Sequence, residues 1–245
     1  MDPLAEKYPG INPYTYVGNN PINFTDPTGM VPENVITTVS NSRRVGNNVK
    51  RDIKINVTLA IFNPNNSDLS KTVYSNSKGG QARFKNFEGT AQSVMGKDKT
   101  EDNITEFTVN YRFVNSLDEI KKDEHVLVVG KNVDNDSNSS GTGIGVAISK
   151  GRVSAVSSET LKDGIFDNTA QHELGHNLGF QHSEIGDLMY ATDSGNSSLN
   201  NKKRGDIISN QISPNTTNGV YQESSKYKTS SSNETRKFIK INGIK

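Results

Sequence analysis

The chain of 245 residues contains no cysteine, so it forms no disulfide bonds and offers no thiolate ligands to a metal ion. It also has no apolar run long enough to span a membrane and no segment with the pattern of a secretory signal. The formal net charge is only +1, which gives no broad basic field to attract nucleic acid. We therefore expect neither membrane insertion nor nucleic-acid binding.

Histidine is scarce but concentrated, because three of the four histidines fall in the run HELGHNLGFQH, from His172 to His182. On an α-helix His172 and His176 are about 6 Å apart along the axis and about 40° apart around it, so both imidazoles can meet one ion. The same helix would place His182 about 240° away. The helix must therefore end first, and Gly179 can adopt the left-handed conformation that ends it.

Three neutral imidazoles suit Zn²⁺, and a catalytic zinc site with three protein ligands keeps a fourth position for water. We predict that His172, His176 and His182 bind Zn²⁺ and that Glu173 is the general base that activates this water. The alternative is a structural zinc site, which needs a fourth protein ligand. The chain has no cysteine for that role, and His125 lies on a predicted strand far away in sequence.

This run resembles the motif of the metzincin zinc peptidases at every specified position. Met189, in the sequence DLMY, resembles the methionine of the Met-turn, which lies under the zinc in that family. Ser183, Leu188 and Tyr190 look most like the matrixin branch, and Tyr190 is not a predicted ligand. The resemblance implies an α+β zincin fold, in which a twisted mixed β-sheet carries an active-site helix, the Met-turn and a C-terminal helix. It also implies a zinc endopeptidase that acts on protein or peptide substrates.

Apolar alternation predicts the remaining elements of such a domain. Residues 53–62 and 107–114 are predicted strands, and residues 125–130 and 145–149 are shorter ones. The apolar spacing within residues 68–87 predicts an amphipathic helix. Further elements are a last helix within residues 199–212 and a weak strand in the sequence KFIKING.

The sequence GTGIG, which begins at Gly141, looks like a phosphate-binding loop but follows a polar loop and leads into a strand. A dinucleotide-binding loop would instead follow a strand and open a helix. In the peptidases that this chain resembles, the strand at this place is the sheet edge to which extended substrates add by backbone hydrogen bonds. An ordinary glycine-rich hairpin is the alternative. The predicted substrate edge consists of Gly143, Ile144, Gly145, Val146 and Ala147.

Residues 1–30 differ from the rest, since they are dense in proline, glycine, asparagine and tyrosine and predict successive turns. This stretch resembles the end of the core associated with Rhs repeats, the shell-forming part of polymorphic bacterial toxins. In that family a variable toxin domain begins just after the core, and many members release it by aspartyl self-cleavage. Asp26, in the sequence DPTG, and Asp2 match the acids of that cleavage.

Four segments follow from these patterns: an Rhs-core end (1–30), a linker (31–49), a metzincin-like peptidase domain (50–212) and a polar, flexible tail (213–245). The predicted function is that of a toxic zinc endopeptidase delivered outside the bacterial cell. Its expected partners are the upstream Rhs shell and a cognate immunity protein. The alternatives are a self-processing or extracellular peptidase and a zinc-bearing binding module without turnover.

Overall fold

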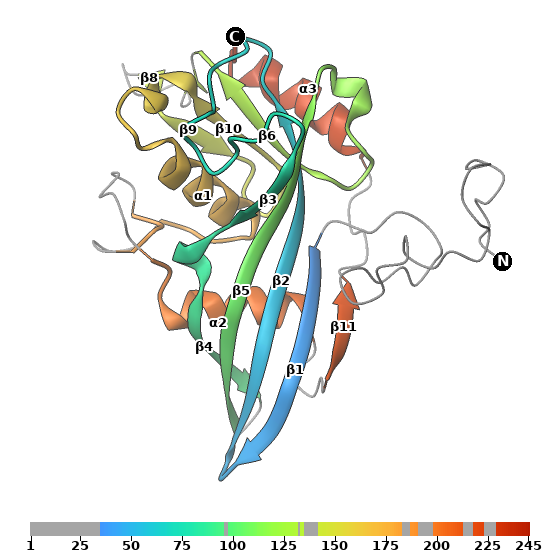
Figure 1. Cartoon of the computed structure of the whole chain (residues 1–245), viewed down its shortest axis with the longest axis vertical. Helices are drawn as coiled ribbons and strands as arrows, with labels where there is room; N and C mark the ends of the chain where they lie inside the picture. Colours follow the sequence, from blue (N-terminus) through green and yellow to red (C-terminus); the bar gives the residue numbers. More distant parts are fainter. Residues whose placement is uncertain are drawn as a thin grey trace, which may run out of the picture. The chain divides into compact units, whose positions relative to one another are not determined.

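A mixed β-sheet forms the centre of the fold (Figure 1). The computed structural model describes residues 35–95, 98–131, 133–134, 142–182, 187–190, 198–212, 218–222 and 229–245. Within them the nine strands of this sheet are β1 (Val35–Val45), β2 (Asn48–Phe62), β3 (Gly80–Arg83), β4 (Gly89–Met95), β5 (Asp98–Val114), β6 (His125–Gly130), β9 (Gly145–Ala147), β10 (Val153–Ser157) and β11 (Gly219–Gln222). A separate pair consists of β7 (Val133–Asp134) and β8 (Thr142–Gly143).

The sheet is built around the parallel pair of β2 and β5, which pair from Val49 with Thr100 to Phe62 with Val114 and shift register once, between Ile53 and Lys54. The end of β2 is also parallel to β6, and β6 is parallel to β10. β9 runs antiparallel to β10 at one end of the strand order, while β1 and β11 extend the other end. The strands predicted within residues 53–62, 107–114 and 125–130 are thus confirmed, the first two as parts of longer strands. Of the predicted strand 145–149, only Gly145–Ala147 form a strand.

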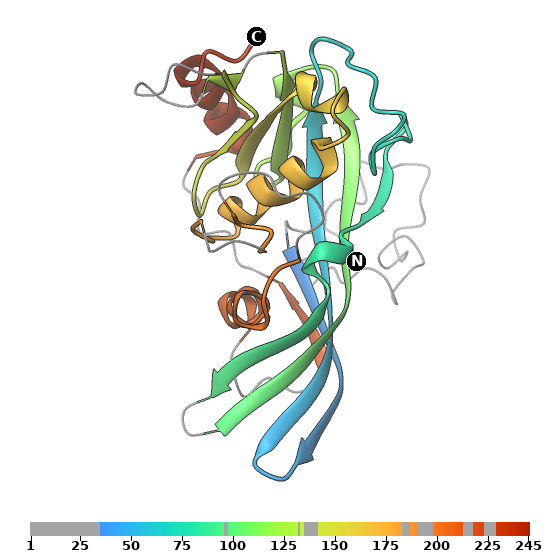
Figure 2. The same cartoon turned by 90° about the vertical axis from the view of Figure 1, so that its left-hand side faces the viewer.

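Helices cover both faces of the sheet. α1 (Phe166–Asn177) and α3 (Ser231–Ile241) lie on opposite sides of β6 and β10, as Figure 2 shows with α1 in yellow and α3 in red. The pleat of β6 explains this division, since Leu127 belongs to the core cluster under α1 whereas Val126 and Val128 belong to the cluster under α3. α2 (Asn201–Gln211) packs against β4 and confirms the helix predicted within residues 199–212.

The helix predicted within residues 68–87 is wrong. That segment contains turns, β3 and a short 3-10 helix (Lys85–Phe87). Leu69 and Tyr74 are buried as their spacing suggested. However, the side chains of Asp68 and Asn76 accept hydrogen bonds from the backbone N–H groups of Ser70 and Lys78, and such local bonds compete with a helix.

The boundaries predicted for a linker (31–49) and a flexible tail (213–245) are also wrong where the structure describes them. β1 belongs to the sheet and pairs with β11 from the tail. The sequence KFIKING lies in and just after α3 and forms no strand, because Ser231, Thr235 and Phe238 recur at helical spacing and are buried. Arg152, fully buried, fixes α3 through Glu234 at 2.7 Å.

Asn34–Lys245 form one compact unit. Its described part is a mixed α/β structure with three α-helices, which is compatible with the expected α+β class. The resemblance to the Rhs core, with Asp2 and Asp26, lies outside the described residues. No helix in the described part is both long and apolar enough to cross a membrane.

Candidate metal centre

The three histidines of the HELGHNLGFQH run are brought together by the end of α1. His172 and His176 lie on the last turns of the helix, and Gly179 follows its final residues with a φ of +103°. The backbone N–H of Phe180 donates to the carbonyl of Gly175, and that of Gly179 donates to the carbonyl of His176. These two bonds form a Schellman motif, which reverses the chain after a helix. The sequence analysis predicted this helix end at Gly179.

The ring nitrogens of the three histidines converge on one point. His176 Nε2 lies 3.0 Å from His172 Nε2 and 3.2 Å from His182 Nε2. Three nitrogens bound tetrahedrally at about 2.05 Å from a zinc ion would be roughly 3.3 Å apart, so the observed spacing is close to that of a zinc site. Within the described residues the cluster consists of these three histidines, and its ligand atoms lie within 4.8 Å of one another.

Backbone carbonyl groups fix the orientation of two of the rings. His172 Nδ1 lies 2.8 Å from the oxygen of Leu188, and His176 Nδ1 lies 2.7 Å from the oxygen of Phe180. Because a carbonyl oxygen only accepts, each Nδ1 carries the hydrogen and each Nε2 presents a lone pair. Two lone pairs 3.0 Å apart repel each other unless a cation lies between them. The donor set therefore fits a metal ion bound by Nε2 atoms.

Burial has opposite effects on the two kinds of titratable group at this centre. It lowers the pKa of His176 to about 4, with the nearby rings of His172 and His182 adding to the shift, so the imidazole is neutral at pH 7 as a ligand must be. Burial also raises the pKa of Glu173 to about 8. A cation bound nearby would lower the pKa of Glu173 again, because it favours the carboxylate.

Glu173 is held between α1 and the edge of the sheet. Its side chain is 5% exposed, and a Cβ atom added at Gly145 of β9 would collide with its Oε1 atom. Such an added Cβ would also lie 2.9 Å from Cγ2 of Thr169. Only a residue without a side chain therefore lets β9 approach the carboxylate this closely.

Met189 lies fully buried beneath the helix, in the turn that follows the histidine run. A Cβ atom added at Gly175 of α1 would collide with its sulfur, so the turn packs directly on the helix between the first two histidines. The same turn supplies the Leu188 carbonyl that orients His172. The turn predicted at Met189 therefore lies in contact with α1, the helix that carries His172 and His176.

Two further residues hold the centre, and the sequence analysis missed both. Asp187 accepts from the backbone N–H of Met189 at 2.9 Å and from the side chain of Asn200, the N-cap of α2, at 2.8 Å. Asn177 donates from its amide to the carbonyl groups of Ile148 and Val153, on either side of the loop between β9 and β10. The sequence signal for Asp187 is its place two residues before Met189, because an aspartate in a turn often accepts a hydrogen bond from the backbone N–H two residues later.

The predicted substrate edge is not one continuous strand, and four of its five residues lie in two separate strands. Gly145, Val146 and Ala147 form β9, which within the described residues pairs only with β10 and is thus an edge strand. Gly143 pairs with Val133 in the small second sheet, and Ile144 lies between the two, 42% exposed.

Comparison with known proteins gives no relative: no family model and no curated protein matches the chain.

Proposed function

We propose that this chain is a zinc-dependent endopeptidase of the metzincin type. The observation that carries the proposal is the convergence of three histidine rings. The Nε2 atoms of His172 and His182 lie 3.0 and 3.2 Å from Nε2 of His176, and backbone carbonyl groups orient the rings of His172 and His176. The edge strand β9, the buried carboxylate of Glu173 and the methionine turn support the finer assignment.

In this proposal the chain's own residues bind the metal and move one proton. His172, His176 and His182 would hold Zn²⁺ through Nε2. When bound, zinc would supply a Lewis acid that polarises the scissile carbonyl group and promotes ionisation of water. Glu173 takes the proton from the attacking water and delivers it to the leaving amine. The outer edge of β9 binds the extended substrate through backbone hydrogen bonds beside this carboxylate.

The decisive experiment compares zinc content and peptide hydrolysis in the wild type and in Glu173→Gln. The amide cannot act as a base, so we expect the variant to keep its zinc and to lose about 100- to 10,000-fold in kcat/KM. Glu159→Gln is the matched control, since that side chain is 62% exposed and pairs only with Lys162 among the described residues. Full activity of Glu173→Gln would exclude the mechanism. Zinc binding by a wild type without hydrolysis would favour the alternative, a zinc-bearing binding module.

We also propose that the peptidase is the toxic effector of an Rhs-type protein, delivered outside the producing bacterium. The resemblance of residues 1–30 to the end of an Rhs core supports this biology. The upstream shell and a cognate immunity protein would then be partners. The alternative is a metzincin that processes its own precursor or degrades extracellular protein.

Expression of residues 31–245 in a bacterial cell separates these two biological roles. This segment includes the whole compact unit Asn34–Lys245. An effector should inhibit growth, Glu173→Gln should relieve the inhibition, and co-expression of a small neighbouring gene should also relieve it. An active peptidase that is harmless to the cell would favour the processing or nutritional role.

A further inference from the structure

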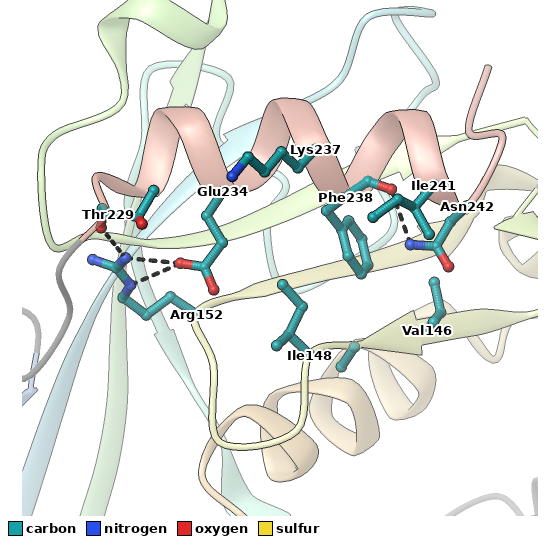
Figure 3. Close-up of a pocket in the computed structure, with 10 residues that line it drawn as sticks. Val146, Ile148, Arg152, Thr229, Glu234, Lys237, Phe238, Ile241 and Asn242 are labelled. Atoms are coloured by element: carbon teal, nitrogen blue, oxygen red, sulfur yellow. Dashed lines mark hydrogen bonds and ion pairs between the residues drawn. The ribbon is translucent and has the colours of Figure 1, made fainter.

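A groove lies between α3 and the end of β9, on the face of the sheet opposite α1 (Figure 3). Its volume is about 510 Å³. Val146 and Ile148 line one side, and Phe238 and Ile241 of α3 line the other. Figure 3 shows the side chains of Phe238 and Ile148 pointing toward each other across it.

Two of the polar side chains that line this groove, Glu234 and Asn242, already have partners. Glu234 accepts two hydrogen bonds from Arg152, at 2.7 and 3.2 Å. Asn242 donates its amide to the carbonyl of Phe238 at 2.9 Å. Ile241, by contrast, is 81% exposed at the end of α3. The groove therefore offers apolar surface to a ligand.

The pleat of β9 connects this groove with the candidate metal centre. Gly145 faces α1, since a side chain there would meet Glu173 and Thr169. The next residue, Val146, points to the opposite face and lines the groove. A peptide that adds to the outer edge of β9 has the same alternation. It would place one side chain toward Glu173 and a neighbouring one toward α3.

We propose that this groove is a specificity subsite for an apolar side chain of an extended peptide substrate paired with β9. The proposal rests on the proposed peptidase function and names a recognition element of that same site. Lys237, which also lines the groove, would disfavour lysine or arginine at that substrate position through charge repulsion. The enzyme should therefore prefer peptides in which the side chain that points toward α3 is apolar rather than polar or basic.

The test measures cleavage of peptides that differ at one scanned position, where each carries Leu, Ser or Lys. The wild type should show a kcat/KM about tenfold higher for Leu than for Ser at one position on the β9-pairing side of the cleaved bond. Ile241→Ser should remove most of this preference by raising KM with little change in kcat. Val45→Ser is the matched control, because Val45 is 47% exposed but lies at the far end of β1.

A second measurement does not depend on turnover. Fluorescence anisotropy of the same peptides with zinc-loaded Glu173→Gln should show the Leu preference, and adding Ile241→Ser should abolish it. Cleavage without apolar selectivity, or selectivity unchanged by Ile241→Ser, would overturn the subsite and leave the peptidase intact. Selective binding without wild-type cleavage would keep the groove and overturn the peptidase function. Neither binding nor cleavage would overturn both.

Discussion

The carboxylate of Glu173 lies against the backbone of Gly145, so the candidate base on α1 and the edge strand β9 are in direct contact. The two residues are distant in the chain, because β10 lies between β9 and α1. The contact places the strand that would bind a substrate beside the group that would move its proton.

Gly145→Ala should therefore impair hydrolysis without loss of zinc. The new methyl group would displace the Glu173 carboxylate, and we expect kcat to fall by about 100-fold, because small misplacements of a catalytic group are costly. Steady-state kinetics and metal analysis would measure the two effects. The matched control is Gly80→Ala on β3, where the new Cβ would make only ordinary contacts with the ring of Tyr111, 3.4 Å away or more. Unchanged turnover of Gly145→Ala would reject the assigned role of this contact.

Removal of any one ligand should weaken zinc binding strongly. We expect His172→Ala, His176→Ala and His182→Ala each to lower the affinity at least about 100-fold, since a direct ligand contributes more than the partner that orients it. His125→Gln should retain the metal, because His125 is not part of the cluster. Titration with zinc in the presence of a competing chelator would measure the zinc affinity of each variant. In the wild type, zinc at 100 times its Kd should also stabilise the fold by about 2.7 kcal/mol. Equal affinities in all four variants would contradict the proposed site.

The raised pKa of Glu173 predicts how stability depends on pH in the chelator-treated protein. Glu173 is protonated in the fold up to about pH 8 but ionises near its ordinary value of 4.5 when unfolded. The stability contributed by the protonated form is present at low pH and is lost as pH rises from about 4.5 to about 8. At about pH 9 Glu173→Gln should exceed the wild type by a few kcal/mol, and near pH 4 the two should be alike. Urea unfolding would measure the difference, with Glu159→Gln as the control. A stability difference between the wild type and Glu173→Gln that does not change with pH would refute the raised pKa of Glu173.

Arg152 should stabilise the attachment of α3. Its fully buried side chain pairs with Glu234 and Asp123 at 2.7 and 3.2 Å. Arg152→Met leaves both carboxylates without this partner, and we expect a loss of about 3–5 kcal/mol in the free energy of unfolding. The control is Arg236→Met, whose pair with Asp118 is exposed and should be worth less than about 1 kcal/mol. If denaturant unfolding shows equal losses in the free energy of unfolding for the two variants, the buried ion pairs of Arg152 stabilise the protein no more than the exposed pair of Arg236.

Predictions from local patterns succeeded where one physical cause dominates. The apolar run in residues 125–130 matches β6 at both ends, because a strand buried on both faces needs continuous apolar side chains. The segment 68–87 failed because its apolar spacing competed with side chains that bond to their own backbone. The strand predicted in KFIKING does not form, because Phe238 belongs to a buried helical face that Ser231 and Thr235, which precede this sequence, complete.

The sequence by itself determined the arrangement of the histidines. Helical spacing puts His172 and His176 on one face, and Gly179 ends the helix before His182, so the geometry depends on short-range backbone preferences. Only the tertiary structure decided that Gly145 covers Glu173 and that α3 forms a groove with Val146. These contacts join residues distant in the chain, and their formation depends on how whole elements pack, which no local pattern specifies.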